Sequence, residues 1–199
     1  MRGFSAARGA IGMALVALSS QGAGAEPLSE VTGNWAGPGG GGFHFRAMLD
    51  GTGDSVTLTI LNGIDGVPPR DAAPDLVVPD FALSAFAANR LEVVEGPEGS
   101  ILQVVTDFAD ETAEGREVVS LQFIDFQFTV TGYSHRAEHY LDSGGTSPYD
   151  CEVDLLTGEV VGSGRHRNPP PIAPENASGW RYDAAFALGW CSIDSPDWG

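Results

Sequence analysis

Two histidines four positions apart are the residues whose types and spacing most directly suggest chemistry. The segment H-R-A-E-H, from His135 to His139, places both imidazoles on one side of a strand or a helical turn, and Asp142 follows closely. Imidazole and carboxylate are ligands for zinc or copper, and His166 or His44 could supply a third ligand. The motif is not H-E-x-x-H, because an arginine stands where that motif has its glutamate. Two hypotheses follow: a divalent metal site at His135, His139 and Asp142, or histidines at a solvated strand end.

A short acidic and glycine-rich segment, D-G-T-G-D from Asp50 to Asp54, is the second candidate for ligand chemistry. It resembles part of a calcium loop, but it has no further oxygen ligands and no closing glutamate. The same composition is typical of a hairpin turn with a purely conformational role. The chain has no G-x-S-x-G elbow and no lysine for a phosphate-binding loop. No catalytic residue is therefore assigned, and carboxylate pairs brought together by folding stay open as an alternative.

The two cysteines, Cys151 and Cys191, predict one structural disulfide. They are 40 positions apart, whereas a redox-active pair is usually spaced C-x-x-C. A pair of free or reactive thiols is the alternative. A bridge indicates an oxidising compartment, and closing a loop of this length would stabilise the fold by about 3 to 4 kcal/mol.

The first 25 residues have the pattern of a secretory signal peptide. Arg2 and Arg8 form a basic region, an apolar run follows, and Ala23-Gly24-Ala25 gives a small-x-small cleavage site. The apolar run is about half of the ~20 residues needed to cross a bilayer, so a permanent anchor is the less favoured alternative. We therefore expect a chain of residues 26–199 that is periplasmic or secreted, soluble, and not attached to a membrane.

The charge of the chain restricts its partners. Ten arginines, no lysine and 27 acidic residues give a net charge of −17, and removal of residues 1–25 would take away two arginines and leave −19. Such a charge repels nucleic acid and anionic lipid. Basic proteins, cationic ligands and divalent metals are the electrostatic partners that this charge allows. An acidity that serves only to keep the protein in solution is the alternative.

Alternating apolar residues predict that the chain is mainly β-sheet. Three hairpins are expected, at residues 43–60, 90–107 and 151–165. Between residues 118 and 133 the apolar positions change from odd to even numbers, which predicts one long strand with a β-bulge or bend at residues 122–124. Residues 79–89 are the one candidate helix, with an alternating strand as the alternative.

The C-terminal part of the chain carries a topological expectation. Residues 180–191 alternate in polarity and predict a last strand. Pairing within the third hairpin places Cys151 far from its turn, so a bridge to Cys191 requires the last strand to run in the same direction as residues 160–165. The proline-rich residues 168–179 would then form an extended crossover.

Aromatic residues offer either a core or a ligand pocket. Trp35, Phe126, Phe128 and Trp190 are the candidates for a pocket that takes a small apolar ligand. Trp35 lies in the segment G-N-W-A-G, which resembles the glycine-x-tryptophan opening of calycin-type barrels such as lipocalins and avidins. The resemblance implies a tryptophan that closes one end of a barrel whose interior binds a small apolar ligand. An ordinary core tryptophan is the alternative.

These observations together predict one all-β, mostly antiparallel domain over residues 26–199, a sandwich or partly open barrel with about eight strands and at most one short helix. The favoured function is non-enzymatic binding of a partner or a small ligand. The alternatives are a metal-dependent or hydrolytic enzyme that uses His135, His139 and nearby acids, and an acidic inhibitor of a basic exported enzyme. No cofactor is predicted apart from the divalent metal of the histidine hypothesis.

Overall fold

The computed structural model describes residues 26–37, 41–52, 54–83, 87–96 and 99–192. The predicted signal peptide, residues 1–25, lies outside the described residues, as does Gly53 of the D-G-T-G-D segment. The described elements are β1 (Ser29–Asn34), β2 (His44–Thr52), β3 (Ser55–Gly63), β4 (Leu76–Leu83), β5 (Ala87–Gly96), β6 (Gly99–Ala109), β7 (Ala113–Ile124), β8 (Gln127–Tyr140), β9 (Thr146–Asp154), β10 (Glu159–Val161), β11 (Glu175–Asn176), the 3-10 helix η1 (Ala177–Gly179) and α1 (Ala184–Ala187).

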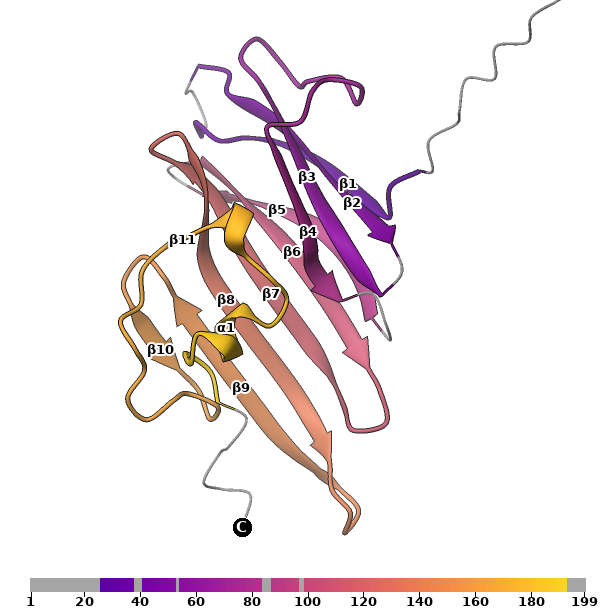
Figure 1. Ribbon diagram of the computed structural model, residues 1–199, viewed down its shortest axis with the longest axis vertical. Coiled ribbons are helices and arrows are strands. Elements are labelled where there is room, and N and C mark those ends of the chain that lie inside the picture. Colours follow the sequence, from indigo (N-terminus) through magenta and orange to yellow (C-terminus); the bar gives the residue numbers. More distant parts are fainter. Residues whose placement is uncertain (1–25, 38–40, 53, 84–86, 97–98, 193–199) are drawn as a thin grey trace, which may run out of the picture.

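The strands form two antiparallel sheets packed as a sandwich (Figure 1). The smaller sheet has four strands in the order β1-β2-β3-β4, and the larger has seven, in the order β10-β9-β8-β7-β6-β5 with β11 beside β8. The predicted all-β fold class is confirmed. In the described part of the chain the two sheets stay separate, so the closed architecture implied by the calycin resemblance is not observed.

Strand alternation places the core between the sheets. In β3, Val56, Leu58 and Ile60 are completely buried, while the residues between them are only partly buried. Burying these side chains stabilises the sandwich by about 1.5 to 3 kcal/mol for each. The three predicted hairpins are confirmed as β2–β3, β5–β6 and β9–β10.

A hairpin turn produces the change in apolar parity between residues 118 and 133, which corrects the prediction of one long bent strand. β7 and β8 are joined by Asp125 and Phe126, whose φ angles are +48° and +64°. Such angles are typical of two-residue hairpin turns, where asparagine or glycine is usual. A register shift is present, but between Ser120 and Leu121 rather than at residues 122–124.

Residues 180–191 form turns and the helix α1, which corrects the predicted last strand. α1 ends in a Schellman motif: the Gly189 amide donates to the Phe186 carbonyl and the Trp190 amide to the Ala185 carbonyl, each at 3.0 Å. Gly189 has a φ of +77°, a conformation that glycine adopts at little cost. The motif turns Trp190 into the core, where its side chain is buried.

The predicted disulfide between Cys151 and Cys191 is confirmed, with Cα atoms 6.0 Å apart. Cys191 also forms an isolated antiparallel bridge with Arg165. The chain returns to β9 through turns and α1, so the parallel last strand deduced from the bridge is not formed. The disulfide ties the C-terminal segment to the larger sheet.

Residues 79–89 do not form the predicted helix. β4 continues to Leu83 and β5 begins at Ala87, while residues 84–86 lie outside the described part. Pro79 is accommodated because β4 is an edge strand whose register against β3 shifts between Val56 and Leu58.

Different elements cover different parts of the larger sheet. The smaller sheet packs against β5 and β6, and the C-terminal segment with η1 and α1 lies over β8 (Figure 1). Phe186 of α1 contacts Tyr133 and His135 of β8 and Tyr149 of β9. No helix among the described residues is long and apolar enough to span a membrane.

Candidate functional site

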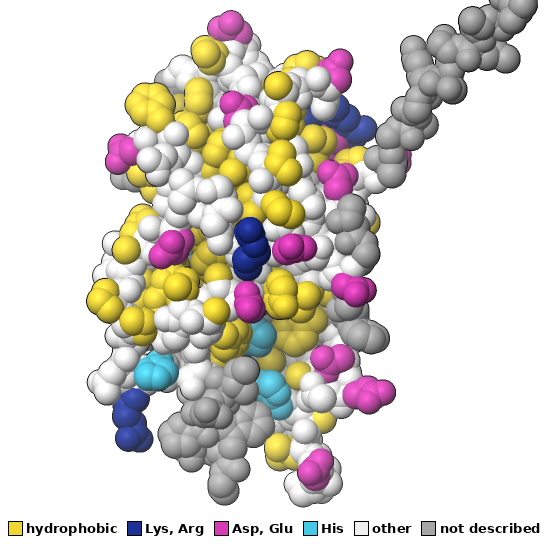
Figure 2. Space-filling view, viewed as in Figure 1, with side chains coloured by type: hydrophobic (Ala, Val, Ile, Leu, Met, Phe, Trp, Pro, Cys, Tyr) yellow, Lys and Arg dark blue, Asp and Glu magenta, His cyan; other side chains and the backbone are white. Residues whose placement is uncertain are grey.

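A cavity of about 220 Å³ lies where the two sheets meet the C-terminal segment. Figure 2 shows histidine side chains among hydrophobic ones on the face that carries α1. The cavity brings together residues from β4 to β8 and from the segment before α1. Its lining residues are Leu83, Ala87, Thr106, Phe108, Asp110, Glu117, His135 and Tyr182.

Strand register places three polar side chains of the cavity in one row. Thr106 pairs with Glu117 across β6 and β7, and Glu117 pairs with His135 across β7 and β8. Direct cross-strand partners have Cβ atoms about 5 Å apart, so each can interact with the next. The His135 ring stacks on Phe108 at 5.2 Å between centroids and meets Phe186 edge-on at 5.5 Å. These two ring contacts hold the His135 side chain in place at the wall of the cavity.

Glu117 is the centre of a hydrogen-bonded group. The Tyr133 hydroxyl donates to Glu117 Oε2 at 2.9 Å. His135 Nδ1 lies 3.5 Å from the Tyr133 hydroxyl oxygen and 3.5 Å from Glu117 Oε2. Burial, reinforced by the charge of Glu117, raises the pKa of Tyr133 well above its ordinary value, so the hydroxyl keeps its proton and donates. The Glu117 side chain is only 15% exposed. It is a carboxylate largely removed from water.

The electrostatic character of the cavity is acidic. Asp110 Oδ1 accepts three hydrogen bonds, from the Thr112 hydroxyl and amide at 2.7 Å and from the Ala113 amide at 3.0 Å. These bonds, led by that of the Thr112 hydroxyl, lower the pKa of Asp110 and keep it ionised. The lining residues include no arginine, and His135 is the one ion-pair partner that Glu117 has in the described part of the chain. The arrangement favours a cationic group.

The predicted metal ligands His135 and His139 both lie on the inner face of β8. The ring of Tyr149 contacts both, with centroids 5.6 Å from His135 and 5.8 Å from His139. Burial, and then the nearby His135, lower the pKa of His139. Asp142 is exposed beyond the end of β8, and the described residues contain no group of three or more His, Cys, Asp or Glu arranged to hold a metal. The metal site stays a prediction.

Three of the four aromatic residues predicted to line a pocket contact one further ring, that of Phe123, whose centroid lies 6.3 Å from Trp35, 6.5 Å from Phe126 and 5.0 Å from Phe128. Trp35 and Phe128 are core residues with ring centroids 6.3 Å apart, and Trp35 Nε1 donates to Asn62 Oδ1 at 2.9 Å. Trp190 is buried next to the disulfide, whereas Phe126 is 90% exposed at the β7–β8 turn. Three of them pack the core, one lies at the surface, and none lines the cavity.

Glu117 and Thr106 are the site residues that sequence reasoning missed. Glu117 shares the parity of Val119 and Leu121, which are buried in β7. A charged residue at a core-facing position is informative, because such residues are almost never buried without a partner. Thr106 carries a weaker form of the same signal, two positions after the buried Val104.

Comparisons of the chain with protein-family models, with curated proteins and with solved structures find no match. The function is therefore argued from the chemistry of the cavity.

Proposed function

We propose that this chain is a binding protein for a small organic cation that has an apolar body, and that the cavity around Glu117 is its binding site. The observation that carries the proposal is a carboxylate only 15% exposed in a cavity without arginine. Glu117 accepts from the Tyr133 hydroxyl at one oxygen, Oε2. A carboxylate with two oxygens has room for further donors, and an ammonium group supplies them together with a compensating charge.

The rest of the lining suits the apolar part of such a ligand. Phe108, Leu83 and Ala87 offer hydrocarbon surface, and the aromatic faces of Phe108 and Tyr182 can attract a cation. A volume of about 220 Å³ is below the range of roughly 300 to 1,000 Å³ of sites for drug-sized molecules. The expected ligand is therefore an amine with one ring or a short chain.

The charge and the disulfide are consistent with this role. A net charge of −17 attracts cations over long range and raises their local concentration. The disulfide and the signal-peptide pattern of residues 1–25 favour an exported protein in an oxidising compartment.

Three probes with the same carbon skeleton test the proposal by isothermal titration calorimetry: 2-phenylethylamine, 2-phenylethanol and phenylacetate. The amine should bind most tightly, and phenylacetate should not bind. A charge-assisted hydrogen bond contributes about 1.5 to 3 kcal/mol, so the alcohol should bind roughly 10 to 100 times more weakly. Equal affinity for the amine and the alcohol, or preference for phenylacetate, would refute a cation site.

A pair of variants locates the site. Glu117→Gln removes the charge but keeps an oxygen that accepts from Tyr133, and it should weaken amine binding by the same factor of roughly 10 to 100. Glu138→Gln is the matched control, because Glu138 is an exposed carboxylate of the neighbouring strand β8 and is not among the cavity residues. It should leave the affinity nearly unchanged.

A further inference from the structure

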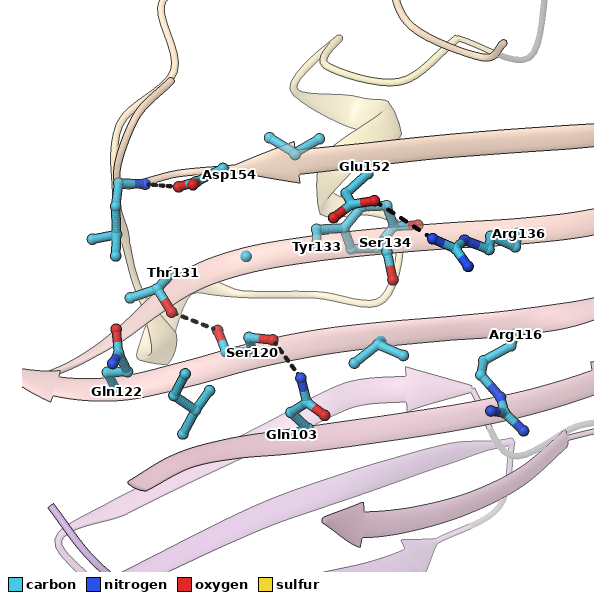
Figure 3. Close-up of a pocket in the computed structure, with 15 residues that line it drawn as sticks. Gln103, Arg116, Ser120, Gln122, Thr131, Tyr133, Ser134, Arg136, Glu152 and Asp154 are labelled. Atoms are coloured by element: carbon cyan, nitrogen blue, oxygen red, sulfur yellow. Dashed lines mark hydrogen bonds and ion pairs between the residues drawn. The ribbon is translucent and has the colours of Figure 1, made fainter. Parts of the chain in front are cut away.

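A second hollow lies on the opposite, outer face of the larger sheet. It is a groove of about 520 Å³ that runs across β6, β7, β8 and β9. Figure 3 shows Arg116 and Arg136 at one end of this outer groove and Gln122 and Thr131 at the other. Adjacent strands are about 4.8 Å apart, so the groove measures roughly 14 Å across its four strands.

Gly132 in the outer groove is a glycine that the fold itself does not require. Its φ is not in the left-handed region, and an added Cβ would have no contact closer than 3.5 Å, the distance to Ser120 Cβ. Gly115 on β7 is the opposite case, because an added Cβ there would overlap the Arg136 carbonyl oxygen. A glycine inside a strand weakens it, and often marks a β-bulge or a place where a ligand approaches closely. Gly132 lies beside a bulge, and the open space at its Cβ position leaves room for a ligand as well.

A β-bulge shapes the groove at this point. Ser120 pairs with Gly132 and Leu121 with Val130, so Thr131 is the extra residue of β8. Bulges of this kind re-aim side chains and are common next to binding sites. The Thr131 hydroxyl lies 3.5 Å from the Ser120 carbonyl oxygen, beside the bare backbone of Gly132.

The groove presents neutral hydrogen-bonding groups. Gln103 Nε2 donates to Ser120 Oγ at 3.2 Å, which leaves the Gln103 amide oxygen available as an acceptor. Within the described part of the chain, the side chains of Gln122 and Ser134 make no hydrogen bond. Amides and hydroxyls that both donate and accept complement the paired hydroxyls of a sugar. Ile101, Val118 and Leu156 add apolar surface for its C–H groups.

The charges of the groove compensate each other on a molecule of net charge −17. Its charged residues are two arginines and two acids, Arg116, Arg136, Glu152 and Asp154. Arg136 pairs with Glu152 at 3.6 Å, and Arg116 pairs with Asp107 at 2.6 Å. A groove without net charge is suited to an uncharged ligand. We propose that the outer groove binds a neutral oligosaccharide.

Affinity electrophoresis and calorimetry with cellohexaose, maltohexaose, xylohexaose and mannohexaose test this second site, with polygalacturonate as the charged comparator. At least one neutral probe should bind. Gly132→Leu fills the groove from an open position and should weaken that binding at least tenfold. Gln122→Ala should weaken it several-fold, while Gln127→Ala, at an exposed glutamine that does not line the groove, should not.

Gly132 lines the groove on the outer face of the sheet and is not among the cavity residues, so Gly132→Leu should leave the affinity for 2-phenylethylamine unchanged. Absence of binding to all four neutral probes would overturn the proposal, and so would binding to polygalacturonate alone. Sugar binding that survives both Gly132→Leu and Gln122→Ala would equally refute the groove as the site.

Discussion

Removal of the disulfide should cost a large part of the stability of this fold. The bridge closes a loop of 40 residues between Cys151 and Cys191. The chain-entropy relation for a loop of that length gives about 4 kcal/mol. Domains of this size are stabilised by only about 5 to 15 kcal/mol, so the protein without the bridge should retain about 1 to 11 kcal/mol at 25 °C. The loop contains β10 and β11, which are strands of the larger sheet, and η1 and α1, which pack on that sheet.

Urea unfolding of the oxidised protein and of the Cys151→Ala/Cys191→Ala variant measures this difference. Trp180 and Trp190 are both buried in the C-terminal segment, so their fluorescence reports its release. We expect the free energy of unfolding to fall by about 4 kcal/mol. A fall of less than about 1 kcal/mol would contradict a stabilising role of the bridge. The other contacts, such as the 2.9 Å hydrogen bond from the Tyr149 hydroxyl to the Ser192 carbonyl, would then suffice to hold the segment.

Three further perturbations test the packing at Gly115, the β7–β8 turn and the burial of His139. Gly115→Ala should destabilise the protein by about 1 to 3 kcal/mol in urea unfolding, because its Cβ would overlap backbone of β8; a neutral effect would contradict this packing. Phe126→Gly should raise the free energy of unfolding by about 0.5 to 1 kcal/mol, because relief of a left-handed conformation outweighs the loss of an edge contact with Phe123; a clear loss would show that the turn depends on the aromatic ring. Burial lowers the pKa of His139 in the folded state, so the unfolded chain takes up a proton at a higher pH than the folded protein does. The free energy of unfolding should therefore fall as the pH drops below about 6.5, and should level off below the folded-state pKa of His139. Urea midpoints between about pH 7.5 and 5 should show a flatter profile for His139→Gln, and an identical profile would contradict the assignment.

Most strands could be predicted because one face of each is buried. Period-two alternation in β2 and β3 marks which side chains face the core, and turn residues mark the ends. The β7–β8 turn escaped because Asp125 and Phe126 adopt left-handed angles without the glycine that normally signals such a turn. The turn shifts the apolar positions from odd to even numbers, and a β-bulge within one strand would produce the same shift.

The C-terminal helix was missed because its residues satisfy two patterns at once. Alternation from Tyr182 to Trp190 fits a strand, while the alanines followed by Gly189 fit a short helix with a Schellman end. Tertiary contacts decide between them, since Phe186 packs on the inner face of β8 and β9.

The cavity could be predicted only in part. The parity of Glu117 in β7 marks it as core-facing, so the sequence contains the signal for one site residue. Its neighbours Thr106 and His135 depend on the register of three strands, and the cavity itself depends on where the smaller sheet stops covering the larger one. Neither can be read from local periodicity.

The most direct test of the cation site is the coupling between Glu117 and the ammonium group of a ligand. It is obtained from the dissociation constants of 2-phenylethylamine and 2-phenylethanol for the wild-type protein and for Glu117→Gln. We expect the substitution to weaken the binding of the amine roughly 10 to 100 times and to leave the binding of the alcohol unchanged. Equal weakening of both probes, or no weakening of either, would contradict a cation site at Glu117.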